Sequence, residues 1–210
     1  MIQWEICLVL IVISKTRLKI IKWCRSYGKS FENLINLKRR KSILVYLAVG
    51  LIVVLSVYFF YPYTPISKNV TIDKIVVYKS DHKLLAFSKN ILIRTFAIAI
   101  GKGGTGAKQF EGDQKTPEGA YFINSKNANS GFHKNLGISY PNAQDMLEAQ
   151  QLGKPAGAEI KIHGLKNGQA FIGKFQRWTD WTNGCIGLTN EEIDDLYAHT
   201  PIGTPILIFK

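Results

Sequence analysis

The sequence predicts a mostly β domain, a sandwich or barrel with peripheral helices, preceded by an N-terminal transmembrane helix. After residue 70, short segments rich in Val, Ile, Phe and Tyr alternate with turn residues, which is typical of strands. Two segments of this region have a helical pattern. Residues 43–61 form a run of 19 residues without a charge. We therefore divide the chain into a basic segment (1–42), a membrane helix (43–61), a linker (62–69) and a folded domain (70–210).

The apolar run at residues 43–61 has the length of a helix that spans a bilayer. At 1.5 Å per residue it extends about 28 Å, close to the hydrocarbon thickness of a membrane. A cleaved signal peptide would have a shorter apolar region and small residues at its end. This run ends in bulky aromatic residues instead. We expect a retained anchor whose aromatic end lies at the membrane interface.

The net charge of +12 is concentrated before this helix. Residues 15–41 contain ten Lys or Arg and one acidic residue, whereas residues 62–210 contain 17 basic and 13 acidic residues. Basic residues gather on the cytoplasmic side of membrane helices. We predict a single-pass protein with a cytoplasmic N-terminus and an extracytoplasmic domain. Topology explains the basic cluster, and no nucleic-acid-binding motif accompanies it.

The first residues of the chain are open to two interpretations. Residues 2–13 are apolar, but Gln3 and Glu5 interrupt them and the stretch is too short to span a bilayer. It is either an interfacial helix or the product of a mis-set translation start. Cys7 and Cys24 precede the membrane helix. They lie on the predicted cytoplasmic side, where thiols stay reduced.

Strands and two helices are predicted in order after the linker. The strand candidates are residues 74–79, 83–87, 91–100, 119–124, 158–163 and 204–209. Asn142 is the expected N-cap of the first helix, and Asn190 that of the second. Acidic residues fill the first turn of the second helix, where the helix dipole favours them. Strands dominate, so the helices are expected to be peripheral.

Residues 101–106 match the pattern G-x-G-x-x-G of dinucleotide-binding sites. That function requires a helix to begin at the last glycine, with its N-terminus holding the pyrophosphate. The residues that follow have no helical periodicity and end at Pro117. We interpret the segment as a glycine-rich loop.

Cys185 is the only cysteine after the membrane helix. It has no disulfide partner within the domain, and a solitary cysteine is most often a small buried residue. Here it follows Asn183 and Gly184 on an expected loop, out of phase with the apolar positions around it. A thiol becomes a strong nucleophile when it loses its proton, which a neighbouring imidazole can accept. The position of Cys185 therefore favours a catalytic thiol.

His163 is the candidate base for this thiol. It ends the expected strand 158–163, in which Ile160 and Ile162 share one face. His163 shares the other face with Glu159 and Lys161, so it points away from the packed side. A satisfied core histidine is the alternative. The alternation favours a functional histidine.

On these residues the chain resembles the L,D-transpeptidase (YkuD-type) catalytic domain, which acts on bacterial peptidoglycan. The family has a histidine-glycine at a strand end, then a loop, then Ser/Thr-His-Gly-Cys. The corresponding residues here are His163-Gly164 and Thr182-Asn183-Gly184-Cys185. Residues 112–121, 140–142 and 203–206 are also similar, and the resemblance covers about residues 70–209. It implies a β-sandwich-like fold and a bacterial inner (cytoplasmic) membrane protein with a periplasmic or extracytoplasmic domain.

The resemblance implies a role for each matching residue. Cys185 is the nucleophile and His163 the general base, while the backbone of Gly184 and Cys185 forms the oxyanion hole. Further oxyanion or substrate-positioning roles fall to Asn183, Gly164, His133 and Tyr140. No metal or cofactor is implied.

The sequence departs from the family at Asn183, where most members have histidine. The form Trp-Thr-x-Gly-Cys is similar to a subgroup that includes hydrolases, which detach covalently bound lipoprotein from peptidoglycan. Three functions follow. The first is an L,D-transpeptidase that links peptidoglycan stem peptides through a thioester. The second is an L,D-hydrolase that cleaves peptidoglycan peptide or peptidoglycan–lipoprotein links. The third is a non-catalytic membrane anchor that binds the cell wall.

Overall fold

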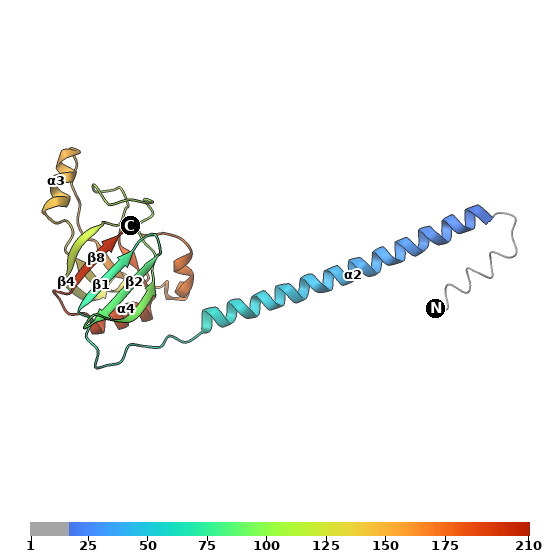
Figure 1. Cartoon of the computed structure of the whole chain (residues 1–210), viewed down its shortest axis with the longest axis horizontal. Coiled ribbons are helices and arrows are strands. Elements are labelled where there is room, and N and C mark those ends of the chain that lie inside the picture. Colours follow the sequence, from blue (N-terminus) through green and yellow to red (C-terminus); the bar gives the residue numbers. More distant parts are fainter. Residues whose placement is uncertain (1–16) are drawn as a thin grey trace. The chain divides into compact units, whose positions relative to one another are not determined.

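The structure is a computed structural model that describes residues 17–210. The predicted features at residues 2–13, with Cys7, lie outside the described residues. The chain divides into two compact units, with the boundary between Tyr61 and Pro62. In the first unit, helix α2 runs from Arg17 to Phe60 and contains both the end of the basic segment and the apolar run (Figure 1).

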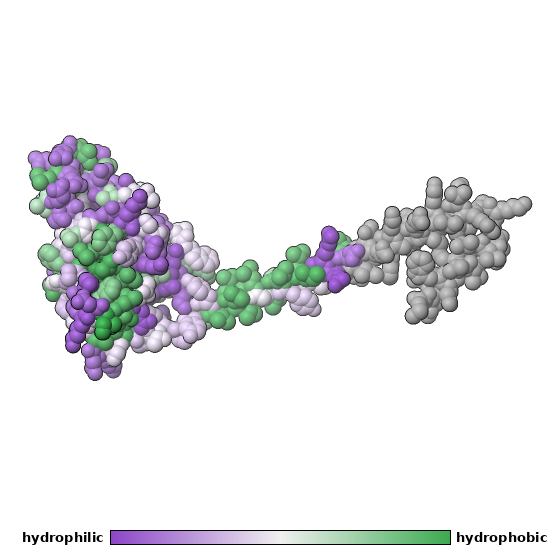
Figure 2. Space-filling view, viewed as in Figure 1, coloured by the Kyte–Doolittle hydropathy of each residue, from purple (hydrophilic) through white to green (hydrophobic). Residues whose placement is uncertain are grey.

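Part of α2 has the composition of a membrane-spanning helix. The segment Arg39–Phe60 has 22 residues and a mean hydropathy of 2.7, and none of it is buried. Figure 2 shows mostly apolar side chains along this part of the helix. By length and composition the segment fits a membrane anchor or a signal sequence.

The second unit is built on one eight-stranded sheet with the strand order β3-β2-β1-β8-β4-β5-β6-β7. The strands are β1 (Lys74–Tyr78), β2 (Lys83–Ser88), β3 (Ile91–Ala97), β4 (Gly119–Ser130), β5 (His133–Ile138), β6 (Lys161–His163), β7 (Ile186–Gly187) and β8 (Pro205–Phe209). Two pairs, β1–β8 and β6–β7, are parallel, and the other pairs are antiparallel.

The two edges of this sheet meet and bring the sheet close to a barrel. Ala99, just after β3, exchanges two backbone hydrogen bonds with Gly187 of β7, at 3.0 and 2.8 Å. Gly101 forms a further bridge with Thr182. The predicted strand 91–100 therefore ends early, because its last residues leave β2 to pair with the opposite edge. The predicted mostly β, barrel-like fold with peripheral helices is confirmed.

The helices lie around this sheet. Helix α3 (Ala143–Gln151) begins after Asn142, whose side chain accepts hydrogen bonds from two backbone N–H groups, as predicted. Helix α4 (Asn190–His199) is capped by Thr189 and not by the expected Asn190. The side chain of Asn190 instead accepts a hydrogen bond from the N–H of Leu165. A 3-10 segment, η1 (Ala170–Trp178), was not predicted.

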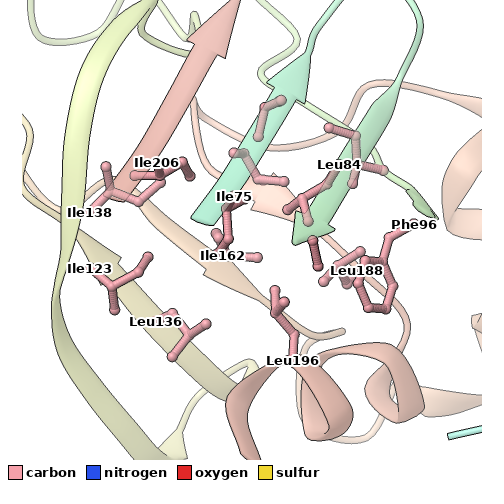
Figure 3. Close-up of a cluster of buried hydrophobic side chains, with 14 of the residues drawn as sticks. Ile75, Leu84, Phe96, Ile123, Leu136, Ile138, Ile162, Leu188, Leu196 and Ile206 are labelled. Carbon is pink, nitrogen blue, oxygen red and sulfur yellow. The ribbon is translucent and has the colours of Figure 1, made fainter. Parts of the chain in front are cut away.

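The hydrophobic core lies between the inner face of the sheet and α4. Figure 3 shows side chains from the strands, such as Ile75, Ile123 and Ile162, gathered with Leu196 of α4. All residues of this core lie between Ile66 and Ile208. Residues 62–210 therefore contain a complete core and form an independently folding domain.

The segment predicted as a linker packs on this domain from Tyr63 onward. The Tyr63 hydroxyl and the Ile66 N–H both donate to the Asp195 carboxylate of α4, at 2.6 and 2.8 Å. Ile66 is buried in the core, and Arg94 of β3 donates to the carbonyl of Thr64 at 2.6 Å. The domain therefore begins several residues before the predicted boundary at residue 70.

The glycine-rich residues 101–106 form a loop, as predicted, and no helix follows them. A buried lysine organises the loop and its continuation. The ammonium of Lys79 donates to the carbonyls of Gly106 and Thr116, at 2.6 and 2.7 Å, and to the carboxylate of Glu118 at 3.0 Å. These two carbonyl oxygens and one carboxylate satisfy the buried ammonium of Lys79. The loop is held in one conformation against the end of the sheet.

Candidate active site

Cys185 and His163 lie on the neighbouring parallel strands β7 and β6, or directly beside them. Ile162 lies opposite Ile186 in this ladder, and His163 lies opposite Gly187. Ile162 and Ile186 are fully buried in the core. Because side chains alternate between the two faces of a strand, Cys185 and His163 share the other face. They are diagonal neighbours on this face.

The imidazole of His163 is held in the tautomer that a base requires. Its Nδ1 atom lies 2.7 Å from the carbonyl oxygen of Gly164. A carbonyl only accepts hydrogen bonds, so Nδ1 carries the proton and Nε2 keeps its lone pair. From the sequence, we expect Gly164 to contact the oxyanion or the substrate. In the structure its carbonyl orients the histidine.

Two aromatic rings enclose His163, which is only 6% exposed. The ring centroid of Phe132 is 4.7 Å from that of His163, and the ring centroid of Trp181 is 5.5 Å away. These two rings also stack on each other at 6.2 Å. The indole N–H of Trp181 donates to the side chain of Gln176 at 3.1 Å, which fixes the ring. These contacts shield the imidazole from water.

Phe132 and Gln176 were not predicted as residues of the site. Phe132 precedes a predicted site residue, and Gln176 lies in a segment without a recognised pattern. Trp181 belongs to the motif that carried the resemblance, four residues before Cys185. No local signal in the sequence pairs Phe132 with His163, because the contact depends on the pairing of β5 with β6.

The turn before Cys185 is braced by Thr182 and requires a glycine. The buried Thr182 hydroxyl donates to the carbonyl of Cys185 at 2.7 Å and accepts from the N–H of Gly184 at 3.2 Å. Gly184 has a φ of +124°, and a Cβ there would lie 2.6 Å from the carbonyl oxygen of Lys115. The N–H of Gly184, predicted as an oxyanion donor, is thus directed at Thr182.

Burial shifts the pKa values of the thiol and of the imidazole in opposite directions. Burial raises the pKa of the Cys185 thiol, although the backbone N–H and the ammonium of Lys161 act in the opposite direction. Burial lowers the pKa of His163, against the hydrogen bond to Gly164, and the charge of Lys161 lowers it further. The sulfur lies 3.6 Å from the carbonyl oxygen of Glu159, to which the S–H donates.

The other predicted site residues occupy different surroundings. Asn183 is exposed at the tip of the turn, next to Cys185. The imidazole of His133 faces Asp194 of α4, with Nε2 2.7 Å from the carboxylate. Tyr140 is buried, and its hydroxyl donates to the carbonyl of Ala156 at 2.9 Å. The substrate-positioning roles expected for His133 and Tyr140 stay predictions.

Among the residues whose side chains the structure describes, no group of three or more His, Cys, Asp or Glu is arranged to hold a metal ion. The chemistry that the site supports from its own residues is nucleophilic. It combines a partly exposed thiol, a base in the correct tautomer and backbone amides at a tight turn.

The sequence matches one protein family over most of the domain. The model of the L,D-transpeptidase catalytic domain (YkuD) matches residues 72–208. YqjB of Bacillus subtilis (strain 168), which carries a provisional L,D-transpeptidase name, is 28% identical over 137 residues, or 64% of this chain and 69% of YqjB. YafK of Escherichia coli (strain K12), with a similar name, is 30% identical over 109 residues, or 50% of this chain and 36% of YafK.

A solved structure has the same fold. The helical cell shape determining protein Pgp2 from Campylobacter jejuni matches with a TM-score of 0.50 and 22% identity, over 68% of this chain and 49% of Pgp2. The chain thus spans about a third of the length of YafK and half of that of Pgp2.

Proposed function

The chain belongs to the L,D-transpeptidase catalytic domain family, and from this premise we propose that it is a cysteine acyltransferase that cross-links the stem peptides of peptidoglycan. The observation that carries the proposal is the parallel register of β6 and β7, which gives Cys185 and His163 the same face of the sheet. The orientation of His163 by the Gly164 carbonyl supports the same assignment.

In the proposed reaction, Nε2 of His163 takes the proton of the Cys185 thiol as the sulfur attacks a carbonyl of the stem peptide. The negative charge that develops on the carbonyl oxygen needs hydrogen-bond donors. Because the Gly184 N–H donates to Thr182, we assign the oxyanion to the Cys185 N–H and the exposed side-chain amide of Asn183. The imidazolium then gives its proton to the amine of the terminal D-alanine, which leaves, and a thioester remains on Cys185.

The second half of the reaction decides between transfer and hydrolysis. An amine from another stem peptide resolves the thioester to a new peptide bond, with His163 again accepting a proton. Water in place of the amine would make the protein an L,D-hydrolase. Asn183 favours that second candidate, because the Trp-Thr-x-Gly-Cys motif that contains it is similar to a subgroup with hydrolases, some of which release cell-wall lipoprotein.

The proposed location follows from the substrate. Peptidoglycan lies outside the cytoplasmic membrane, so the domain has to be extracytoplasmic. The segment Arg39–Phe60 would span the inner membrane as a retained anchor. The basic residues at the N-terminal end of this segment, such as Arg39 and Arg40, would keep the N-terminus in the cytoplasm.

Purified disaccharide-tetrapeptide muropeptides test this function with the domain 62–210. We expect release of D-alanine and formation of cross-linked dimers, because the thioester needs an acceptor amine and the muropeptide supplies one. The products are separated by liquid chromatography and weighed by mass spectrometry. Tripeptide monomers without dimers would assign hydrolysis. No change in the muropeptides would contradict both transfer and hydrolysis at the stem peptide. Cys185→Ala protein is the matched control.

A further inference from the structure

The segment η1 exposes three large aromatic side chains between the two proposed catalytic residues in the sequence. Phe171 is 77% exposed, Phe175 41% and Trp178 61%. Phe175 and Trp178 contact each other edge to face, with ring centroids 4.6 Å apart. We call these three side chains the aromatic platform. A large exposed apolar patch on a folded domain often marks a binding surface.

The platform is not a loose loop, because polar residues of η1 fasten it to the domain. The buried side chain of Gln176 donates to the carbonyl of Gly187 in β7 at 3.4 Å and accepts from the indole of Trp181 at 3.1 Å. Arg177 donates to the carboxylate of Glu192 in α4 at 2.6 Å. The usual order is therefore reversed: polar side chains face the protein and aromatic ones face solvent.

The platform continues into the candidate active site. Trp178 and Trp181 are three residues apart, which limits the distance between their Cα atoms to about 10 Å. Trp181 stacks with Phe132, and both rings contact His163. A substrate that reaches Cys185 therefore has Trp178 close to it along the chain.

We propose that the aromatic platform binds the sugar rings of the peptidoglycan glycan strand, next to the stem peptide that reacts. This inference rests on the proposed function and specifies which part of the substrate the domain holds. A pyranose ring has an apolar C–H face that stacks on a planar aromatic ring, while its hydroxyls stay in water. The stem peptide is attached to the glycan strand, so sugar rings accompany any stem that reaches Cys185.

The charge of η1 favours a neutral ligand over an anionic lipid surface. Lipid headgroups attract clusters of about four to eight Lys or Arg residues. The segment Ala170–Trp178 has only Lys174 and Arg177, and the guanidinium of Arg177 is paired with Glu192. Planar rings with so few basic residues beside them fit N-acetylated sugars better than an anionic bilayer.

Binding of N-acetylglucosamine hexasaccharide and of peptide-free glycan strands tests the proposal without catalysis. Isothermal titration calorimetry measures the binding of these glycans to the Cys185→Ala form of residues 62–210. We expect Phe171→Ala/Trp178→Ala to weaken binding at least tenfold, because both exposed rings are lost. Circular dichroism and thermal unfolding verify that this double variant is folded. Phe209→Ala is the control, since Phe209 is an exposed aromatic that stacks on Tyr78 of β1.

The activity of the corresponding Cys185-containing proteins gives a second readout. The double variant should act normally on a glycan-free tetrapeptide and at least tenfold more slowly on intact sacculi. Unchanged glycan binding in the double variant, or an equal loss in Phe209→Ala, would overturn the proposal. So would binding to phosphatidylglycerol vesicles that needs the platform while the sugars do not bind. Failure of the proposed function has a different signature: no reaction with the tetrapeptide, with glycan binding intact.

Discussion

Replacement of Cys185 by alanine is expected to reduce the release of D-alanine from a tetrapeptide by at least about 10⁴-fold, because no other side chain can form the acyl intermediate. His163→Gln removes the proton acceptor but keeps a polar side chain of similar length. General-base catalysis contributes about 10²–10⁴-fold, so kcat/KM should fall by about 10³-fold. Steady-state kinetics with the domain 62–210 measures both effects.

The pH dependence of the same reaction distinguishes a base from a structural histidine. Burial lowers the pKa of His163, and the base is active only when neutral. Activity is therefore expected to be lost as the pH falls, with the midpoint of the acid limb of kcat/KM below about pH 6.5. The His163→Gln variant should lack this limb. His133→Gln is the control, with nearly unchanged kinetics, since His133 faces Asp194. An acid limb that persists without His163 would contradict the assignment.

Gly184→Ala is expected to be the most damaging change in the turn before the nucleophile. Its Cβ would lie 2.6 Å from the carbonyl oxygen of Lys115, at a φ of +124°. Both the strain and the contact have to be relieved by moving the turn, which costs about 3 kcal/mol of folding free energy. Displacement of Cys185 by about 1 Å would lower kcat by roughly 10²-fold. Urea unfolding and kinetics measure the two effects.

Gly168→Ala separates backbone strain from the steric contact. Gly168 has a φ of +84°, yet nothing lies within 4 Å of a Cβ at that position. We expect this variant to lose only about 1 kcal/mol of stability and to keep its activity. If the two variants behave alike, the contact with Lys115 does not position Cys185.

Local patterns in the sequence were sufficient for much of the fold. The strands β1, β2 and β8 have alternating or apolar runs bounded by turn residues, and they were predicted within one or two residues. The cap at Asn142 was also predictable, because its side chain serves its own helix. Strands β5 and β7 were missed. β5 contains Lys, Asn and Gly, and β7 has only two residues, so pairing with β6 defines both.

The candidate nucleophile and base were predicted from the sequence, and their roles stay predictions, whereas several neighbouring residues were not predicted. The apolar alternation around Ile162 predicts that His163 lies on the other face of β6, and there Phe132 and Trp181 cover its ring. The hydrogen-bond partner of His163 Nδ1 is the backbone carbonyl of Gly164. Every residue has a backbone carbonyl, so the residue type at this position does not predict the contact. The cap of α4 illustrates the same limit. Thr189 and Asn190 are both good N-caps, and the contact of Asn190 with Leu165 decides between them.

We propose that the Cys185 sulfur becomes acylated and that His163 is the base. Mass spectrometry of the intact domain is the most direct test of this acylation. After rapid quenching in acid, the domain 62–210 mixed with a tetrapeptide should gain the mass of the acyl tripeptide, and peptide mapping should locate it on Cys185. The His163→Gln variant should acquire this mass at least about 10²-fold more slowly. Turnover of the tetrapeptide by Cys185→Ala protein, or an acyl group on another residue, would contradict the account.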